Sequence, residues 1–457
     1  MNVQTNPLPD VVVVGAGVGG LCAAVRLAKA GARVCVLEAK AVIGGRASSF
    51  RDPQTGDRVD NGQHVLVGGY RETFEFLRML GTADRVWLQP NLDVEFVDQQ
   101  NVRSRLRCPS LPPPMHLLAG LLDWDAISWR DRVAATQLAP AIRVARQVID
   151  AQARGQRSPL AAASPGETVE QWLINNGQTA RLREMLWDPL ALAALNQSPK
   201  EAAAPPFARV LAQMFGGEPR EAALGLPSVP LDDLFADPAR RFIEERGGEI
   251  RVGAAATIVL EDDRVSHVEV RGERLAVPLV VCAVPWYVLP EIFAGNTSLM
   301  APIQQAAAAT AASPIVSVNL WLDRPALRTP FLGLPGRTFQ WVFDKEQLFK
   351  EVATSHVTLV SSGASAIIGE TNEACIEVAL RELRNAMPDT RAARVLRASV
   401  VRERRATFSL APGQPRRPAT ATPIWGLFLA SDWVDTGLPA TIESAVLSGR
   451  LAADALS

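Results

Sequence analysis

The sequence predicts an α/β protein in which a parallel sheet that binds a nucleotide is interrupted twice by a second domain of helices and antiparallel strands. A glycine-rich turn joins a buried strand to a helix near the N-terminus, and two more strand-rich segments follow after long insertions. We expect the nucleotide-binding domain to comprise residues 8–75, 229–292 and 415–457. Residues 76–228, which look mainly helical, and residues 293–414, whose apolar residues alternate, would form the second, α+β domain.

The glycine-rich turn lies in the stretch VVVVGAGVGGLCAAVRLAKAGARVCVLEA, residues 11–39. It opens with an uninterrupted apolar run, as expected for a parallel strand that is buried on both faces. Gly15, Gly17 and Gly20 then fit G-x-G-x-x-G: the first allows a tight turn, the second lets a pyrophosphate approach the backbone, and the third lets the next helix pack closely. The N–H groups at the start of that helix, predicted over residues 21–30, favour an anion.

A second predicted strand, residues 33–37, ends at Glu38. An acid about 20 residues past the glycines can bind the hydroxyls of a ribose. The same negative charge disfavours a ribose 2′-phosphate by repulsion. This Rossmann-like unit therefore predicts a dinucleotide ligand, and NAD and FAD both fit it.

A further pair of glycines, followed by an arginine, comes shortly after the second strand. In AKAVIGGRASSF, Gly45 brings backbone close to a ligand, and Arg46 offers a fork of donors to a phosphate or to the polar edge of a ring system. Taken alone, this loop could equally be solvated. Because it follows the glycine fingerprint, we expect it to bind the cofactor.

The stretch VDNGQHVLVGGY places several polar residues between predicted strands. Polar groups in an apolar setting are costly unless they are satisfied, so we expect this stretch to line one face of the cofactor or to cap a turn. The residues concerned are Asp60, Asn61, Gly62, Gln63, His64 and Tyr70.

The C-terminal stretch, residues 424–456, distinguishes between the two ligands. It predicts a buried strand, then Ser431 and Asp432, then a helix that begins near Thr441. Asp432 could bind the hydroxyls of a ribityl chain, and the amides near Ile442 could face the pyrimidine edge of a flavin. A nicotinamide needs no second site of this kind, whereas an FAD extended across the domain does. FAD is therefore the predicted cofactor, and the alternative is an ordinary helix cap.

Composition argues against several classes of function. The 457 residues include 47 basic and 48 acidic side chains, and this balance gives no reason to expect a nucleic acid partner. The 5 cysteines and 4 histidines are scattered, so we expect neither a disulfide framework nor a metal site, and a cytoplasmic protein fits best. No signal peptide or membrane-spanning segment is recognisable.

Longer stretches resemble a known family. EAKAVIGGRA, after the glycine motif, resembles the amine-oxidase and phytoene-desaturase superfamily of FAD proteins. Within it, DNGQHVLVGGYRETFEFL, LWDPLALAALN and FLASDWVDTGLPATIESAVLSGRLAA resemble the squalene-associated branch, the hydroxysqualene dehydroxylases of hopanoid biosynthesis. The resemblance covers nearly the whole chain. It implies that the protein uses reduced flavin to convert hydroxysqualene, an isoprenoid lipid, to squalene with loss of water.

The resemblance also implies which residues hold FAD. Ala256 falls where relatives carry a residue whose backbone meets the adenine. Two positions depart from the family pattern: Lys40 replaces an arginine, and Ser431 replaces a glycine, so that a left-handed backbone at Ser431 would be strained. With the residues argued above, the expected cofactor-binding set is Gly15, Gly17, Gly20, Glu38, Ala39, Lys40, Gly45, Arg46, Gly62, Gln63, His64, Ala256, Asp432, Thr441 and Ile442.

Loss of the hydroxyl group calls for a general acid, because hydroxide is a poor leaving group. Candidate acids are His64, Asp60 and Asp188, while Asn196 and Tyr70 could orient the hydroxyl. For His64 the alternative is a structural histidine, and for Asp188 it is a helix cap. An apolar pocket would keep water away from the cation that forms.

Residues 107–129, RCPSLPPPMHLLAGLLDWDAISW, combine a proline run with leucines and tryptophans. This segment could dip into a membrane surface and admit lipid, which would make the protein peripheral at the inner face of the membrane. A packed helix of the second domain explains the pattern equally well.

Other functions are compatible with the same residues. A carotenoid or phytoene desaturase, or a polyene isomerase, would use flavin on a similar hydrocarbon, and the sequence fixes neither the direction of the chemistry nor the length of the polyene. A carrier of prenylated lipid without redox chemistry would share the fold. An amine oxidase is disfavoured, because no aromatic cage is recognisable and aromatic residues make up only 6% of the chain. The sequence indicates neither the electron donor that reduces FAD nor the oligomeric state.

Overall fold

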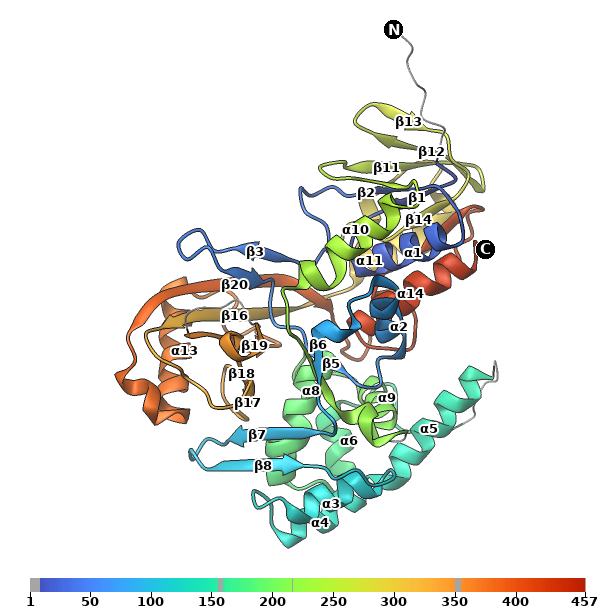
Figure 1. Cartoon of the computed structure of the whole chain (residues 1–457). Coiled ribbons are helices and arrows are strands. Elements are labelled where there is room, and N and C mark those ends of the chain that lie inside the picture. Colours follow the sequence, from blue (N-terminus) through green and yellow to red (C-terminus); the bar gives the residue numbers. More distant parts are fainter. Residues whose placement is uncertain (1–8, 155–157, 159, 216, 350–354, 457) are drawn as a thin grey trace.

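The computed structural model describes residues 9–154, 158, 160–215, 217–349 and 355–456 (Figure 1). Residues 8 and 457, the outer ends of the expected nucleotide domain, lie outside these ranges. The boundaries of the two expected domains stay a prediction. The sheets, in contrast, are defined by the structure.

The central sheet has five strands that all run parallel, in the order β10-β2-β1-β14-β21. These strands come from three separate parts of the chain, as the sequence predicts. The α/β fold class with a parallel Rossmann-like sheet is thereby confirmed. The strands are β1 (Val11–Val14), β2 (Val34–Leu37), β10 (Glu249–Arg251), β14 (Val280–Cys282) and β21 (Leu427–Leu429).

The two faces of the parallel sheet are covered differently. Val11 and Val13 pack on helices α1 (Val18–Lys29), α10 (Asp237–Glu244) and α14 (Ile442–Asp454). Val12 and Val14 belong to the core on the opposite face, which includes residues of a second, four-stranded sheet. Both faces are therefore buried, which explains the uninterrupted apolar run in β1. The second sheet consists of β11 (Ala256–Glu261), β12 (Arg264–Val270), β13 (Glu273–Leu275) and β15 (Phe293–Gly295).

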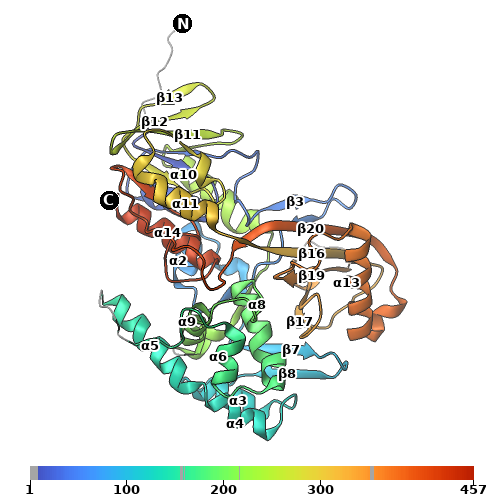
Figure 2. The same ribbon diagram turned by 180° about the vertical axis from the view of Figure 1, so that it is seen from behind.

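Helix α14 is held against α1 by two glycines. A Cβ built on Gly449 would lie 2.3 Å from the carbonyl oxygen of Gly19, so only glycine fits there. This contact brings the N-terminus of the last helix beside the glycine-rich turn of the first strand–helix unit. The two helices lie side by side (Figure 1), and Figure 2 shows α14 from the opposite side of the molecule.

The remaining large sheet has seven strands in the order β20-β16-β19-β18-β17-β7-β8. Strands β7 and β8 come from the first insertion, which the sequence predicts to be mainly helical, and the other five come from the second. The junction is a parallel pairing of Gly333 with Phe96. The strands are β7 (Asp93–Val97), β8 (Arg103–Arg107), β16 (Ala312–Leu322), β17 (Phe331–Gly333), β18 (Trp341–Asp344), β19 (Ser355–Ser362) and β20 (Val395–Phe408).

Most helices of the first insertion gather at the end of the molecule that lies far from β11–β13 (Figure 1). Within the described ranges, no helix is both long enough and apolar enough to cross a membrane. The helices not yet named are α2 (Arg71–Leu80), α3 (Met115–Asp123), α4 (Trp129–Thr136), α5 (Ala139–Ala153), α6 (Val169–Asn175), α7 (Ala180–Leu182), α8 (Asp188–Leu195), α9 (Ala204–Phe215), α11 (Ala301–Ala309), α12 (Lys345–Leu348) and α13 (Asn372–Ala386).

Short elements connect these layers. Two π-helical turns precede α8 and α10, at Arg183–Trp187 and Asp232–Ala236. Turns of 3₁₀ helix lie at Ala83–Arg85, Pro219–Ala222, Leu289–Glu291, Ser298–Met300 and Pro388–Ala392. The small sheets pair β3 (Ser49–Arg51) with β4 (Arg58–Asp60), and β5 (Leu66–Val67) and β6 (Val86–Leu88) with β9 (Leu224–Pro227).

Candidate active site

One cavity of about 580 Å³ is lined by residues of both the parallel sheet and the seven-stranded sheet. It begins at the turn between β1 and α1 and continues to the apolar side chains of β7, α8 and α9. We call it the central cavity. Its lining changes from polar to apolar along its length. The first part lies at the glycine-rich turn, the middle part lies at the loop after β4, and the far part is apolar.

The glycine-rich turn forms the first part of the central cavity. Gly15 has a φ of +107°, and a Cβ there would lie 2.7 Å from the carbonyl oxygen of Ala283. A Cβ on Gly20 would lie 2.0 Å from the carbonyl oxygen of Gly15. A Cβ on Gly17, in contrast, would meet no atom within 4 Å. Gly15 and Gly20 are thus required by the turn itself, whereas Gly17 leaves backbone open to a ligand.

The acid at the end of β2 is fixed by the backbone around it. Glu38 accepts hydrogen bonds from the N–H of Ala16, at 2.8 Å, and from the N–H of Lys40, at 2.9 Å. Together with Ala39 and Ala256, Glu38 and Lys40 line the same end of the cavity as the glycines. This arrangement fits a ribose next to a pyrophosphate, because the carboxylate is already oriented by backbone donors.

The second glycine pair packs directly on the first turn. The N–H of Gly44 donates to the carbonyl oxygen of Ala16 at 2.8 Å, and a Cβ on Gly45 would lie 3.1 Å from the Cα of Gly17. Arg46 follows, donating to the carbonyl oxygen of Ala406 at 2.7 Å. The arginine is therefore held at the border between the parallel sheet and β20.

Asp432 lines the cavity beside Arg46 and near the start of α14, where the Thr441 side chain accepts a hydrogen bond from the N–H of Ser444 at 3.1 Å. Thr441 and Ile442 line the cavity at this point. The strain expected at Ser431 is not found: in the described part of the chain, the non-glycine residues with positive φ are Asn101, Asn196, Asp262 and Arg271. Serine is accommodated there without a left-handed backbone.

The loop after β4 places Gly62, Gln63 and His64 in the wall of the middle part, and Tyr70 also lines it. Burial lowers the pKa of His64 below its ordinary value, so the imidazole is neutral near pH 7. It can therefore donate or accept a hydrogen bond there, but it does not bring a positive charge into the cavity.

Asp60 does not reach the central cavity. Its carboxylate accepts hydrogen bonds from Lys345 Nζ at 2.9 Å, from Ser49 Oγ at 2.8 Å and from the N–H of Leu231 at 3.1 Å. The side chains of Asp60 and Lys345 are only 3% and 2% exposed. Asp60 is thus a buried partner of Lys345, and the structure does not support the role of general acid that the sequence offers for it.

Asp188 also lies away from the cavity lining. Leu186, Pro189 and Leu190 face the cavity from the same helical segment. At 100° per residue, position 188 points to the opposite side of a helix whose cavity face contains 186, 189 and 190. Burial raises the pKa of Asp188, but this acid is not brought to the place where chemistry would occur.

Asn196 lines the cavity, but its amide is already engaged. It ends α8 with a φ of +49°. Its Nδ2 donates to Thr407 Oγ1 at 3.0 Å and to the carbonyl oxygen of Ser313 at 3.2 Å, and its Oδ1 accepts from the N–H of Gly363 at 2.8 Å. Asn196 therefore ties α8 to the seven-stranded sheet, and has little capacity left to orient a substrate.

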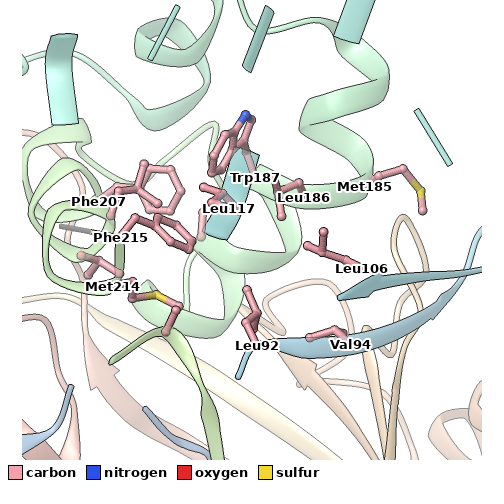
Figure 3. Close-up of a cluster of buried hydrophobic side chains, with 14 of the residues drawn as sticks. Leu92, Val94, Leu106, Leu117, Met185, Leu186, Trp187, Phe207, Met214 and Phe215 are labelled. Atoms are coloured by element: carbon pink, nitrogen blue, oxygen red, sulfur yellow. The ribbon is translucent and has the colours of Figure 1, made fainter. Parts of the chain in front are cut away.

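The far part of the central cavity is apolar (Figure 3). Its walls come mainly from β7, β8, α8 and α9, and they belong to the largest hydrophobic cluster among the described residues. Such a surface favours a hydrocarbon and excludes water. The cavity-lining side chains labelled in Figure 3 are Leu92, Val94, Leu106, Leu186, Met214 and Phe215.

The seven-stranded sheet contributes polar residues that sequence reasoning missed. Ser317, Trp341 and Glu403 line the middle of the cavity, and Glu403 accepts a hydrogen bond from Asn61 Nδ2 at 3.4 Å. A signal for Ser317 was present in PIVSVNLWL, where polar positions 317 and 319 alternate with valines and a leucine. No local pattern distinguished Trp341 or Glu403 from surface residues.

The polar part of this cavity fits FAD: an open glycine backbone, an oriented acid, an arginine with an aspartate, and a helix N-terminus lie along one path. The fold and the cavity define a dinucleotide-dependent oxidoreductase with a large apolar substrate site. No group of three or more potential metal-ligating side chains is found in the ranges that the structure describes.

Comparisons with known proteins agree with this class. A family model of flavin containing amine oxidoreductases matches residues 18–457, and the chain belongs to this family. Hydroxysqualene dehydroxylase of Rhodopseudomonas palustris is 30% identical over 97% of both chains. The 15-cis-phytoene desaturase of Solanum lycopersicum is 26% identical over 99% of this chain and 78% of its own. Cyclohexylamine oxidase of Brevibacterium oxydans shares the fold, with a TM-score of 0.70, 16% identity, and coverage of 98% and 99%.

These findings establish an FAD-dependent oxidoreductase of the amine oxidase and carotenoid desaturase family. Membership of this family also argues against the alternative of a carrier without redox chemistry. The named relatives leave the substrate open between hydroxysqualene and a carotenoid precursor.

Proposed function

We propose that this protein reduces hydroxysqualene to squalene. In the overall reaction, hydroxysqualene and reduced FAD give squalene, oxidised FAD and water. FAD, when bound and reduced, supplies the hydride that replaces the hydroxyl group. The observation that carries the proposal is the central cavity itself, in which a polar, cofactor-shaped part opens into an apolar part that suits a long isoprenoid chain.

The relatives support this choice of substrate. Hydroxysqualene dehydroxylases of three bacteria are 27–30% identical to the chain and match it over 97% of both lengths. Several plant 15-cis-phytoene desaturases reach 25–26% identity. The difference is small, so the distinction must come from chemistry.

The residues of the chain would perform three tasks in this reaction. The cofactor would be held by the glycine-rich turn, the pair Gly44 and Gly45, and the side chains of Glu38, Arg46 and Asp432. Its ring system would lie near the Gly62–His64 loop and the start of α14. The apolar side chains shown in Figure 3 would keep water away from the carbon that loses its hydroxyl group. His64 would meet that hydroxyl group as a neutral hydrogen-bonding side chain, because among His64, Asp60 and Asp188 it is the one that lines the cavity within the described ranges.

An anaerobic single turnover tests the proposal. The bound flavin is reduced chemically, hydroxysqualene is added, flavin absorbance is followed and the lipid is extracted. Flavin reoxidation with formation of squalene is the expected result. Reduced flavin that persists beside intact hydroxysqualene would refute it, and flavin reduction by phytoene in the oxidised protein would then identify a desaturase.

The His64→Ala and Asp188→Asn proteins sharpen this test. We expect His64→Ala to slow the single turnover by about tenfold or more, since a positioned proton-transfer or hydrogen-bonding group typically contributes at least that much. Asp188→Asn is the matched control, because Asp188 lies outside the cavity lining. Equal rates in both variants would remove His64 from the mechanism.

We further propose that the α3–α4 region contacts a lipid surface. Exposed apolar side chains gather there: Leu111, Met115, Leu122, Trp129 and Val133 are each 40–68% exposed. The opposite side of α3 packs into the cluster that lines the apolar part of the cavity, through Leu117 and Leu121. Arg130, which follows Trp129 in α4, is exposed and would favour anionic headgroups beside this apolar patch.

A further inference from the structure

Three cavity-lining residues have a buried polar atom without a hydrogen-bond partner among the described residues: Ser317 Oγ, Gln63 Oε1 and Trp341 Nε1. Ser317 is only 1% exposed. Ser317 and Gln63 are considered together because the loop that contains Gln63 lies against the strand of Ser317. An unsatisfied buried polar group costs about 1–3 kcal/mol, so such atoms call for a ligand or for water.

The strand register fixes where Ser317 points. Val401, Ser317, Val360 and Trp341 are direct neighbours across β20, β16, β19 and β18, and all four line the cavity. Residues paired in this way share one face of an antiparallel sheet. The intervening residues of β16, such as Val316, pack into the core on the opposite face instead. Ser317 is therefore a polar position set into the sheet wall of the cavity.

This row of paired residues continues along the apolar part of the cavity and gives its length. From Trp341 it passes through Gly333 to Phe96, which also lines the cavity. Since neighbouring strands lie about 4.8 Å apart, the sheet extends about 19 Å from Ser317 to Phe96. Ser317 thus stands where the polar part of the cavity ends and a long apolar wall begins.

Gln63 approaches the same place from the other wall. A Cβ on the adjacent Gly62 would lie 3.9 Å from Ser317 Oγ, so the loop after β4 lies directly against β16. Gln63 donates from Nε2 to the carbonyl oxygen of His64 at 3.0 Å, which leaves Oε1 as a free acceptor. Ser317 Oγ can donate and accept.

From this pairing we propose that Ser317 and Gln63 together bind the hydroxyl group of the substrate, and so select an isoprenoid alcohol over the corresponding hydrocarbon. A hydroxyl group has one donor and two acceptor positions. Its hydrogen would go to Gln63 Oε1, and its oxygen would accept from Ser317 Oγ. A hydrocarbon in the same place would leave both protein atoms buried and unpaired. The inference rests on the proposed function and names the substrate feature that the site recognises.

Binding of two lipids to the oxidised holoenzyme tests the inference without any turnover. The probes are hydroxysqualene and squalene in detergent micelles, and the measurement is the dissociation constant of each from equilibrium dialysis. We expect the unmodified protein to prefer hydroxysqualene by about tenfold, the factor that one or two net hydrogen bonds supply. Equal affinities would overturn the inference, whether or not any variant folds.

The variants Ser317→Ala and Gln63→Met should each reduce this preference about fivefold or more, by weakening hydroxysqualene binding alone. Ser399→Ala is the matched control: its Oγ on the neighbouring strand is also buried and without a partner in the described structure, but Ser399 does not line the cavity. The inference fails if Ser317→Ala weakens the binding of both lipids equally, or of neither. It also fails if this variant instead changes FAD affinity or the flavin spectrum, because the substrate hydroxyl group then pairs elsewhere.

The outcome is separable from that of the proposed reaction. A protein that prefers the alcohol through Ser317 but forms no squalene would retain the inference and lose the function. A protein that forms squalene with the same selectivity in the Ser317→Ala variant would retain the function and lose the inference.

Discussion

Arg46 and Asp432 lie 386 positions apart in the sequence, and Nη2 of the arginine contacts Oδ1 of the aspartate at 2.5 Å. The contact joins the first segment of the chain to the last at the place where the cofactor is expected. Asp432 is 6% exposed and Arg46 is 27% exposed at their side chains, so the pair is largely sheltered from solvent. Both halves of the pair also line the central cavity.

Replacing Asp432 by asparagine should weaken FAD binding by about tenfold or more, because hydrogen bonds to a charged group are worth roughly 1.5–3 kcal/mol. Titration of the apoprotein with FAD, followed by flavin fluorescence, measures this. Asp435→Asn is the control, since Asp435 lies in the same segment, is 58% exposed and pairs with Arg417 instead. Unchanged FAD affinity in Asp432→Asn would show that Asp432 has only a structural role.

The first and third glycines of the motif should respond differently from the second. Gly17→Ala should leave the stability of the apoprotein unchanged, because the new Cβ meets nothing within 4 Å, but should reduce FAD affinity by blocking the pyrophosphate. Gly20→Ala should destabilise the fold, because its Cβ would lie 2.0 Å from a backbone oxygen. Thermal unfolding and FAD titration of both variants check this. A Gly17→Ala protein with full FAD affinity would contradict the assigned role.

Replacing either Asp60 or Lys345 should cause a large loss of stability. Removing one member of a buried ion pair costs about 3–5 kcal/mol, because the other charge is left unpaired. We therefore expect Asp60→Asn and Lys345→Met each to lower the free energy of unfolding in urea, and the double variant to lose less than the sum of the two. A stable Asp60→Asn protein that no longer turns over would instead restore Asp60 as a catalytic acid.

The burial of His356 should make the stability of the fold depend on pH. Burial lowers its pKa to about 3, and the ring stacks on Trp321 with its centroid 4.3 Å away. The folded protein therefore binds fewer protons than the unfolded chain below about pH 6.5, so stability from this group falls as the pH drops from 6.5 toward 3, by about 1.4 kcal/mol per unit. His356→Gln should show a smaller slope in urea unfolding at pH 6.5, 5.5 and 4.5. Identical slopes would contradict this assignment.

The proposed lipid contact predicts a specific pattern of vesicle binding. Making Trp129 and Leu122 polar should reduce flotation with anionic vesicles, since these side chains are 68% and 54% exposed. Leu121 is only 3% exposed, and its replacement would test the core rather than the surface. The control replaces Trp425, which is 61% exposed outside this region. Equal flotation of all proteins would exclude the α3–α4 contact.

The nucleotide-binding unit could be predicted because its signals are local. Gly15 has a positive φ and Gly20 packs on the carbonyl oxygen of Gly15, so both are required by local structure, and Glu38 follows from the end of a strand. Asp432 was found because it sits between a strand and a helix start. In each case a short stretch of sequence indicates the site, although Arg46, the partner of Asp432, lies 386 positions away.

Properties that depend on distant partners could not be predicted. The partner that neutralises Asp60 is Lys345, 285 positions away, and no pattern near Asp60 indicates it. The pairing of β7 with β17 likewise joins two insertions, so strands were overlooked in a region that looks helical. Asp188 is different, because its position could have been worked out from the sequence. The helical spacing of Leu186, Pro189 and Leu190 places Asp188 on the side of the helix opposite to these apolar residues.

The order of strands in the parallel sheet also constrains synthesis of the protein on the ribosome. The edge strand β21 and the helix α14 come from the last part of the chain, yet they supply Asp432, Thr441 and Ile442 to the cavity. A nascent chain that lacks these elements contains the glycine-rich turn but not the residues at the other end of the expected FAD site. FAD capture should therefore require that β21 and α14 have been synthesised and folded, and a chain truncated before them should not retain flavin.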